Sequence, residues 1–110
     1  MTALPEPLVR PTRYEVSLLP EDDINYLTYV VAVEARGNNR WAVVRYPICL
    51  GVDGQWDWES IPSEREDDWL AAHRFDLDTA LRLAREAAPH VTVNGITAAQ
   101  AWRRAQGKEN

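Results

Sequence analysis

The sequence predicts an α+β domain, in which a four-stranded antiparallel β-meander is followed by about three helices that cover one face. Three observations indicate this fold class. Residues 13–59 alternate apolar and polar side chains with the period of a β-strand. Short turn signals separate these runs, and strands joined by short turns pair antiparallel. After Pro62 the apolar residues recur at helical spacing instead.

The strand pattern predicts four strands, at 13–19, 26–35, 40–50 and 55–59. Gly37-Asn38-Asn39 is a hairpin turn signal, because glycine and asparagine tolerate positive φ. Asp53-Gly54 predicts a type I′ turn before the fourth strand. Pro47 conflicts with a regular central strand, since it has no N–H for the ladder. We expect a bulge there, or an end of pairing on one side.

The helical half begins with Ser63 and Glu66, which have the spacing of a capping box. Asp76 is the expected N-cap of a helix over 77–88, which Pro89 ends. A short extended run and an Asn94-Gly95 turn come next. A second capping box then opens a last helix, which runs to about Ala105, and its members are Thr97 and Gln100.

Domain organisation follows from the distribution of prolines and from chain length. Residues 1–12 contain three prolines among small and polar residues, which predicts a flexible arm. Residues 13–106 form the expected single domain, because 110 residues suffice for one core. Residues 107–110 are an expected frayed tail.

Composition favours a soluble globule, with 45% hydrophobic and 26% charged residues. Cys49 is the only cysteine, so the chain cannot form an internal disulfide, and a reducing cytoplasm is the expected location. The sequence has no secretion signal pattern and no apolar run of membrane-spanning length. We expect no cofactor and no bound metal, because phosphate loops, zinc patterns and nucleophile motifs are lacking.

The net charge of −5 is unevenly distributed. Residues 52–78 carry nine acids against two arginines, whereas residues 79–110 have a net charge of +3. Sequence-independent nucleic-acid binding needs clustered basic residues, so these totals argue against it as the main activity. The acidic middle of the chain favours a basic protein partner instead.

The candidate site lies in this acidic middle. Strand alternation places Trp56 and Trp58 on one face, with Asp57 and Glu59 on the other. A structural interpretation makes the acids a dipole-matched helix start and the tryptophans core anchors, as expected also for Trp41, Trp69 and Trp102. The functional interpretation is an acidic, tryptophan-bearing surface that docks or inhibits a basic partner. Its candidate residues are Trp56, Asp57, Trp58, Glu59, Glu64, Glu66, Asp67 and Asp68.

A non-enzymatic protein-interaction module is therefore the expected function, and two alternatives stay open. One is a nucleic-acid-binding accessory protein that uses the C-terminal arginines. The other is a small ligand-binding or enzyme domain with a sheet–helix pocket that holds His73 or Cys49 beside a carboxylate. A sheet edge could also mediate a homodimer. The arginines of the first alternative are Arg82, Arg85, Arg103 and Arg104.

The stretch from Cys49 to Ala98 resembles small actinobacterial proteins that have no established activity and are often encoded near phage or mobile elements. Its most specific parts are Trp56 through Phe75 and the helix start from Asp76 to Leu81. The resemblance implies a bacterial or phage cytoplasmic setting and an accessory role. It transfers no functional residues.

Overall fold

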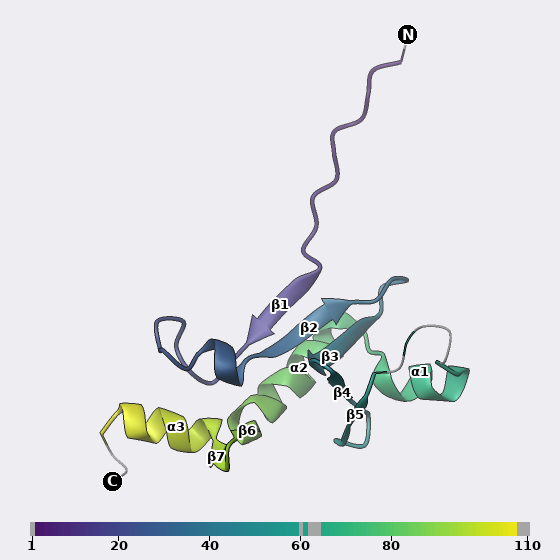
Figure 1. The fold of residues 1–110 in the computed structure, drawn as a ribbon. Helices are drawn as coiled ribbons and strands as arrows, with labels where there is room; N and C mark the ends of the chain where they lie inside the picture. Colours follow the sequence, from purple (N-terminus) through teal and green to yellow (C-terminus); the bar gives the residue numbers. More distant parts are fainter. Residues whose placement is uncertain (1, 60, 62–64, 108–110) are drawn as a thin grey trace.

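An antiparallel sheet of five strands forms the centre of the computed structural model, which describes residues 2–59, 61 and 65–107 (Figure 1). Each strand pairs with its neighbour in the sequence, so the antiparallel meander is confirmed, with five strands instead of four. β1 and β5 are the two edges of the sheet, and a homodimer through either edge stays a prediction. The strands are β1 (Arg13–Val16), β2 (Val31–Ala35), β3 (Trp41–Arg45), β4 (Ile48–Leu50) and β5 (Trp56–Trp58).

The additional strand arises at Pro47, where the expected third strand is divided in two. β3 and β4 pair with each other, with Val44 opposite Cys49 and Arg45 opposite Ile48. The connection is the two-residue turn of Tyr46 and Pro47, whose peptide bond is cis. Because proline cannot donate to the ladder, the chain reverses here. The expectation of a bulge or a one-sided end of pairing was therefore wrong.

The first two strands are shorter than their sequence patterns predict. β1 stops at Val16, and the segment before β2 contains the 3₁₀ helix η1 (Leu27–Tyr29). Tyr29 is nearly fully buried, and its hydroxyl donates to the carbonyl oxygen of Ile96 at 2.9 Å. This tertiary contact favours the 3₁₀ turn over the strand that the β-branched and aromatic composition predicts.

The turns between the strands partly match their predictions. Gly37, Asn38 and Asn39 have positive φ in the β2–β3 turn, as expected. Gly54 also has positive φ, but Asp53 does not, so the predicted type I′ turn was wrong. A longer loop closes instead with a bond from the N–H of Gly51 to the carbonyl of Gln55. The Asp53 carboxylate accepts the N–H of Gln55 at 3.0 Å and stabilises this loop.

Helix α2 (Leu77–Ala87) packs across β1, β2 and β3 on one face of the sheet (Figure 1). Asp76 is its N-cap, as predicted, and accepts the backbone N–H of Thr79 at 2.8 Å. That hydrogen bond lowers the pKa of Asp76. Small side chains on the helix allow close approach to the sheet, and the buried residues at this interface are Val31, Val33, Val43, Ala80 and Ala84.

Helix α1 (Asp67–His73) packs on the opposite face of the sheet. Its Trp69 packs on a second buried cluster of Ala32, Ala42, Val44 and Cys49. The expectation that the helices cover one face was therefore wrong, because strand alternation gives both faces apolar side chains. Glu66 is itself the N-cap of α1, and its side chain forms no capping hydrogen bond. It therefore does not occupy the third helical position, which the predicted capping box requires. Ser63 lies outside the described residues.

The C-terminal part forms a small separate unit beside the five-stranded sheet (Figure 1). It comprises η3 (Ala88–His90), the hairpin of β6 (Thr92–Val93) and β7 (Ile96–Thr97), and α3 (Ala98–Ala105). The predicted capping box of Thr97 and Gln100 is confirmed, with both reciprocal hydrogen bonds present.

Helix α3 packs mainly on η3 and β7 rather than on the sheet. Of its residues only Ala98, the first, is buried. Trp102 is 36% exposed, so its predicted core position was wrong. At the other end of the chain, residues 2–12 are extended and exposed, and project from β1 (Figure 1).

Candidate functional site

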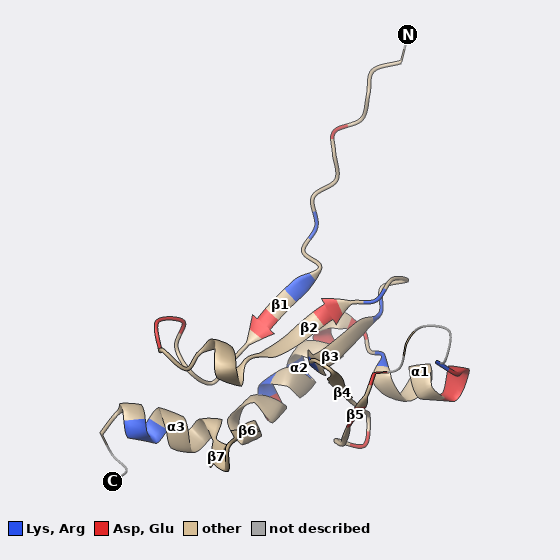
Figure 2. Cartoon of the chain, viewed as in Figure 1, with Lys and Arg blue, Asp and Glu red and all other residues tan. Residues whose placement is uncertain are grey.

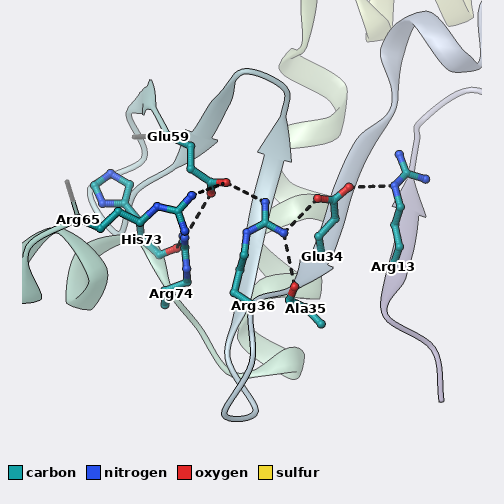
Figure 3. A network of polar contacts seen from close by, with 8 residues as sticks. All are labelled: Arg13, Glu34, Ala35, Arg36, Glu59, Arg65, His73 and Arg74. Carbon is teal, nitrogen blue, oxygen red and sulfur yellow. Dashed lines mark hydrogen bonds and ion pairs between the residues drawn. The ribbon is translucent and has the colours of Figure 1, made fainter. Parts of the chain in front are cut away.

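A row of alternating charges crosses the sheet face that carries α1, and we call it the charge network (Figure 3). Arg13 on β1 binds Glu34 on β2 at 3.0 Å, and Glu34 in turn binds Arg36 at 3.1 Å. Arg36 then reaches Glu59, just after β5, at 2.8 Å. The register of the meander brings these residues together, because Arg13 and Glu34 are direct cross-strand partners. The members are Arg13, Glu15, Glu34, Arg36, Glu59, Arg65 and Arg74.

Glu59 is the point where three arginines meet (Figure 3). Its Oε1 lies 2.8 Å from Arg36 Nη2 and 3.5 Å from Arg65 Nη2. Its Oε2 lies 3.4 Å from Arg74 Nη2, and neither of these two buried atoms has a hydrogen-bond partner among the described residues. One carboxylate is thus shared among three guanidinium groups in a largely buried setting. Removing one partner from such a buried cluster leaves uncompensated charge.

Arg74 is the most deeply buried cation of the network, at 8% exposure. Its Nη1 donates to the carbonyl oxygen of His73 at 2.9 Å. Burial lowers the pKa of Arg74, and the nearby carboxylate of Glu59 opposes this effect. Burial also lowers the pKa of Arg36, but hydrogen bonding and attraction to Glu59 outweigh it and raise the pKa overall. The two arginines therefore differ in how fully their charge is compensated.

Trp69 of α1 contacts two arginines that flank the helix in the sequence. The guanidinium carbons of Arg65 and Arg74 lie 5.9 and 5.1 Å from its ring centre, within the range of a cation–π contact. His73 stacks on the same ring with centroids 4.2 Å apart and an interplanar angle of 14°. The predicted core role of Trp69 is thus combined with an electrostatic one.

His73 and Asp57 form a second polar pair beside the network. His73 Nε2 lies 3.0 Å from Asp57 Oδ2, and His73 Nδ1 lies 2.7 Å from the carbonyl oxygen of Trp69. A ring protonated on both nitrogens donates to both acceptors. A Cβ at position 51 would lie 2.9 Å from Asp53 Oδ1 and 3.2 Å from His73 Nε2, so a larger residue there would force these side chains to shift.

Catalytic chemistry finds little support in this arrangement. Burial raises the pKa of the Cys49 thiol to about 11, so the sulfur is protonated at neutral pH and is a poor nucleophile. Cys49 shares no hydrogen bond with His73 in the described part of the chain. Within that part, no group of three or more His, Cys, Asp or Glu side chains is arranged to hold a metal ion.

The eight predicted site residues fall into different environments. Trp56 is half-buried against the α2-side core, whereas Trp58 on the same face is 72% exposed. Asp57 and Glu59 lie on the opposite face, as predicted, but Glu59 is paired with arginines and Asp57 with the His73 ring. The expected acidic face is therefore smaller than eight residues suggest.

The remaining acids of the predicted site stand at the start of α1 (Figure 2). Asp67 and Asp68 occupy its first turn, next to the N-cap Glu66, and all three are exposed. Glu64 lies outside the described residues. The side chains of Asp67 and Asp68 form no hydrogen bond or ion pair with the described part of the chain, so their charges stay available to solvent.

The arginines around Glu59 were missed as site residues. Strand alternation indicated that Glu59 shares a face with Asp57, but the partner Arg36 is 23 residues away in the sequence. The basic C-terminal residues, by contrast, lie on two separate helices, α2 and α3 (Figure 2). Arg82 is already paired with Glu86 at 3.1 Å. Nucleic-acid binding through these arginines stays a prediction.

A hollow of about 580 Å³ lies between η1, the β6–β7 hairpin and α3, and is lined in part by Ile24, Tyr29 and Ile96. Neither His73 nor Cys49 lines it. In the described part of the chain, no helix has the length and apolar character to cross a membrane. Comparisons with protein-family models, curated proteins and solved structures found no match to this chain.

Proposed function

We propose that the protein is a non-enzymatic interaction module that docks a basic partner protein through the segment after β4. The observation that carries this proposal is the exposure of Trp58, at 72%. A tryptophan contributes a large apolar area when a partner covers it, and tryptophan is enriched among the residues that dominate binding energy. Trp58 therefore supplies the apolar anchor of the proposed surface.

Residues that follow Trp58 in the sequence supply the further chemistry of the proposed docking segment. Ile61 is 59% exposed and adds apolar area three residues after Trp58. Glu66, Asp67 and Asp68 add three exposed carboxylates. Carboxylates on an interface rim steer a basic partner toward it and make association sensitive to salt. Glu59 is already paired with arginines, and the exposed Asp57 carboxylate lies 3.0 Å from His73 Nε2, so these two acids contribute less free charge to the segment.

The test is capture of partners from a lysate by the full-length chain, with mass spectrometry, at low and moderate salt. The proposal expects one basic protein that is lost with Trp58→Ala and with the triple variant Glu66→Gln, Asp67→Asn, Asp68→Asn. A matched control removes the same charge elsewhere, since Glu6, Glu21 and Asp22 are also exposed. Its variant Glu6→Gln, Glu21→Gln, Asp22→Asn should keep the partner.

Each result has a defined meaning. Equal loss in the triple variant and its control would show that net charge, not this surface, governs binding, and the docking surface would be wrong. Retention of the partner by Trp58→Ala would remove the observation on which the proposal rests. Circular dichroism of each variant establishes that it is folded before binding is compared.

A further inference from the structure

The β2–β3 turn and helix α1 border a hollow of about 370 Å³, and the charged residues in the described part of its lining are all arginines. Arg36, Arg40 and Arg74 line it, and Asn38 adds an amide. No aspartate or glutamate of the described part of the chain belongs to the lining, although the chain as a whole carries a net charge of −5. The described lining is therefore positively charged, and the carboxylates of Glu34 and Glu59 pair with its arginines from outside it.

Arg74 brings an incompletely satisfied positive charge to this hollow. Its side chain is only 7% exposed, and its buried Nη2 has no hydrogen-bond partner in the described part of the chain. The nearest carboxylate oxygen, Glu59 Oε2, is 3.4 Å away and equally without a hydrogen bond. Glu59 is also shared with Arg36 and Arg65. A buried cation in this position is stabilised by any further anion that reaches it.

Arg36 and Arg40 complete the lining in different ways. Two hydrogen bonds, to Glu34 and Glu59, hold the Arg36 guanidinium in a fixed orientation. The Arg40 guanidinium is exposed and forms no hydrogen bond or ion pair with a described residue. The hollow thus combines a buried cation, an oriented cation and an exposed cation. Arginines that are already oriented lower the ordering cost of binding.

The chemistry of the lining selects an oxyanion with more than one negative charge. Planar guanidinium groups match the oxygen geometry of phosphate and donate several charge-assisted hydrogen bonds to it. Leu70 and Ala71 of α1 form an apolar wall that suits the carbon part of an ester. We propose that this hollow binds the phosphate group of a small phosphate ester, with Arg36, Arg40 and Arg74 as its ligands.

The experiment titrates the full-length ¹⁵N-labelled chain with pyrophosphate, then with glycerol phosphate, at constant ionic strength. Saturable shifts are expected for the amides of residues 36–40, 70–71 and 74. Arg40→Gln should weaken binding by about tenfold, the effect of losing one charge-assisted hydrogen bond. The matched control is Arg103→Gln, which removes the same charge from an exposed position on α3 and should bind as the natural chain does.

Several outcomes overturn the proposal. Linear, non-saturating shifts would show general ionic effects, and equal weakening in Arg40→Gln and Arg103→Gln would show dependence on net charge alone. Binding of a short oligothymidylate that depends on Arg40, without binding of either phosphate probe, would replace the small ligand with a nucleic acid. This result is distinguishable from the protein partner proposed above, because Trp58, Glu66, Asp67 and Asp68 are not among the described residues that line the hollow.

A second variant tests the same idea from the opposite direction. Glu59 is the internal counter-ion of the arginines, so Glu59→Gln should strengthen pyrophosphate binding. Weaker binding by folded Glu59→Gln would contradict the proposal. Pyrophosphate should also raise the unfolding midpoint of this variant more than that of the natural chain, because a ligand stabilises the state it binds.

Discussion

At the scale of single residues, Glu59 determines whether a group of buried cations is compensated. Its side chain is 15% exposed and faces three arginines. Removing one partner of a buried ion pair leaves uncompensated charge in a medium of low polarity. Surface pairs behave differently, because water and salt already screen them.

Glu59→Gln is therefore expected to lower the free energy of unfolding by about 3 kcal/mol. The control Glu86→Gln breaks the Arg82–Glu86 pair, whose side chains are 60% and 61% exposed, and should lower it by at most about 0.5 kcal/mol. Urea unfolding monitored by tryptophan fluorescence gives both values. Similar losses for the two variants would mean that the Glu59 cluster contributes no more than a surface pair.

The reactivity of the Cys49 thiol tests whether this side chain is buried in solution. Raising the thiol pKa from 9.0 to about 11 lowers the thiolate fraction at neutral pH by about a hundredfold. Since the thiolate is the reactive form, alkylation by iodoacetamide should be at least about a hundredfold slower in the native chain than in urea. Native labelling should accelerate as pH rises, because deprotonation then increases. Mass spectrometry follows the reaction, and equal native and denatured rates would contradict the buried position.

At the scale of elements, the capping box stabilises the start of α3, a helix that has few packing contacts with the five-stranded sheet. Thr97 Oγ1 accepts the N–H of Gln100 at 3.1 Å, and the Gln100 side chain accepts the N–H of Thr97 at 2.8 Å. Thr97→Ala should lower the free energy of unfolding by about 1 kcal/mol, whereas Thr97→Ser should stay close to the natural chain. Chemical denaturation measures both. A neutral Thr97→Ala would show that tertiary contacts of the hairpin, not the cap, fix the start of α3.

Several local signals in the sequence predicted local structure correctly, although the type I′ turn at Asp53-Gly54 and the capping-box role of Glu66 were wrong. The N-cap Asp76, the Thr97 capping box and the turns at Gly37–Asn39 and Asn94-Gly95 each depend on residues within about four positions. Strand alternation also placed Asp57 and Glu59 on the same face. These features required no knowledge of distant neighbours.

Features that depend on distant residues could not be predicted in the same way. The sequence predicted only a strand irregularity at Pro47 and not a chain reversal, because the apolar pattern continues through this position. The charge network depends on register, and a shift by one residue would move a side chain to the other face. Arg13 and Glu34 are 21 residues apart, and no local pattern links them. For this reason the arginines of the candidate site emerged only from the fold.

At the scale of the whole molecule, the N-terminal arm dominates the outline. The molecule measures 68 × 37 × 21 Å and has a radius of gyration of 17.0 Å, whereas a compact chain of this length has about 13 Å. Residues 2–12 are exposed throughout, and the carbonyl of Thr12 accepts the N–H of Ala35 at the start of the sheet. The arm therefore extends the molecule without contributing to its core.

Deleting residues 1–11 should change the free energy of unfolding by no more than about 0.5 kcal/mol, as expected for exposed positions. The radius of gyration from X-ray scattering should fall toward about 13 Å. A deletion of α3 from Ala98 onward is a suitable contrast, because Ala98 is fully buried and its loss should destabilise the domain. A large loss of stability on removing the arm would mean that it packs on the domain in solution.

The order of the strands also has a consequence for synthesis on the ribosome. Because each strand pairs with the one made just before it, the sheet can close while the chain is still emerging, without waiting for the C-terminus. Helix α2, which covers the apolar face, is made only after β5 is complete. At ordinary translation rates this interval is about 1.5 to 6 s. During that time the nascent protein presents an uncovered apolar sheet, on which a chaperone could act before the helix arrives.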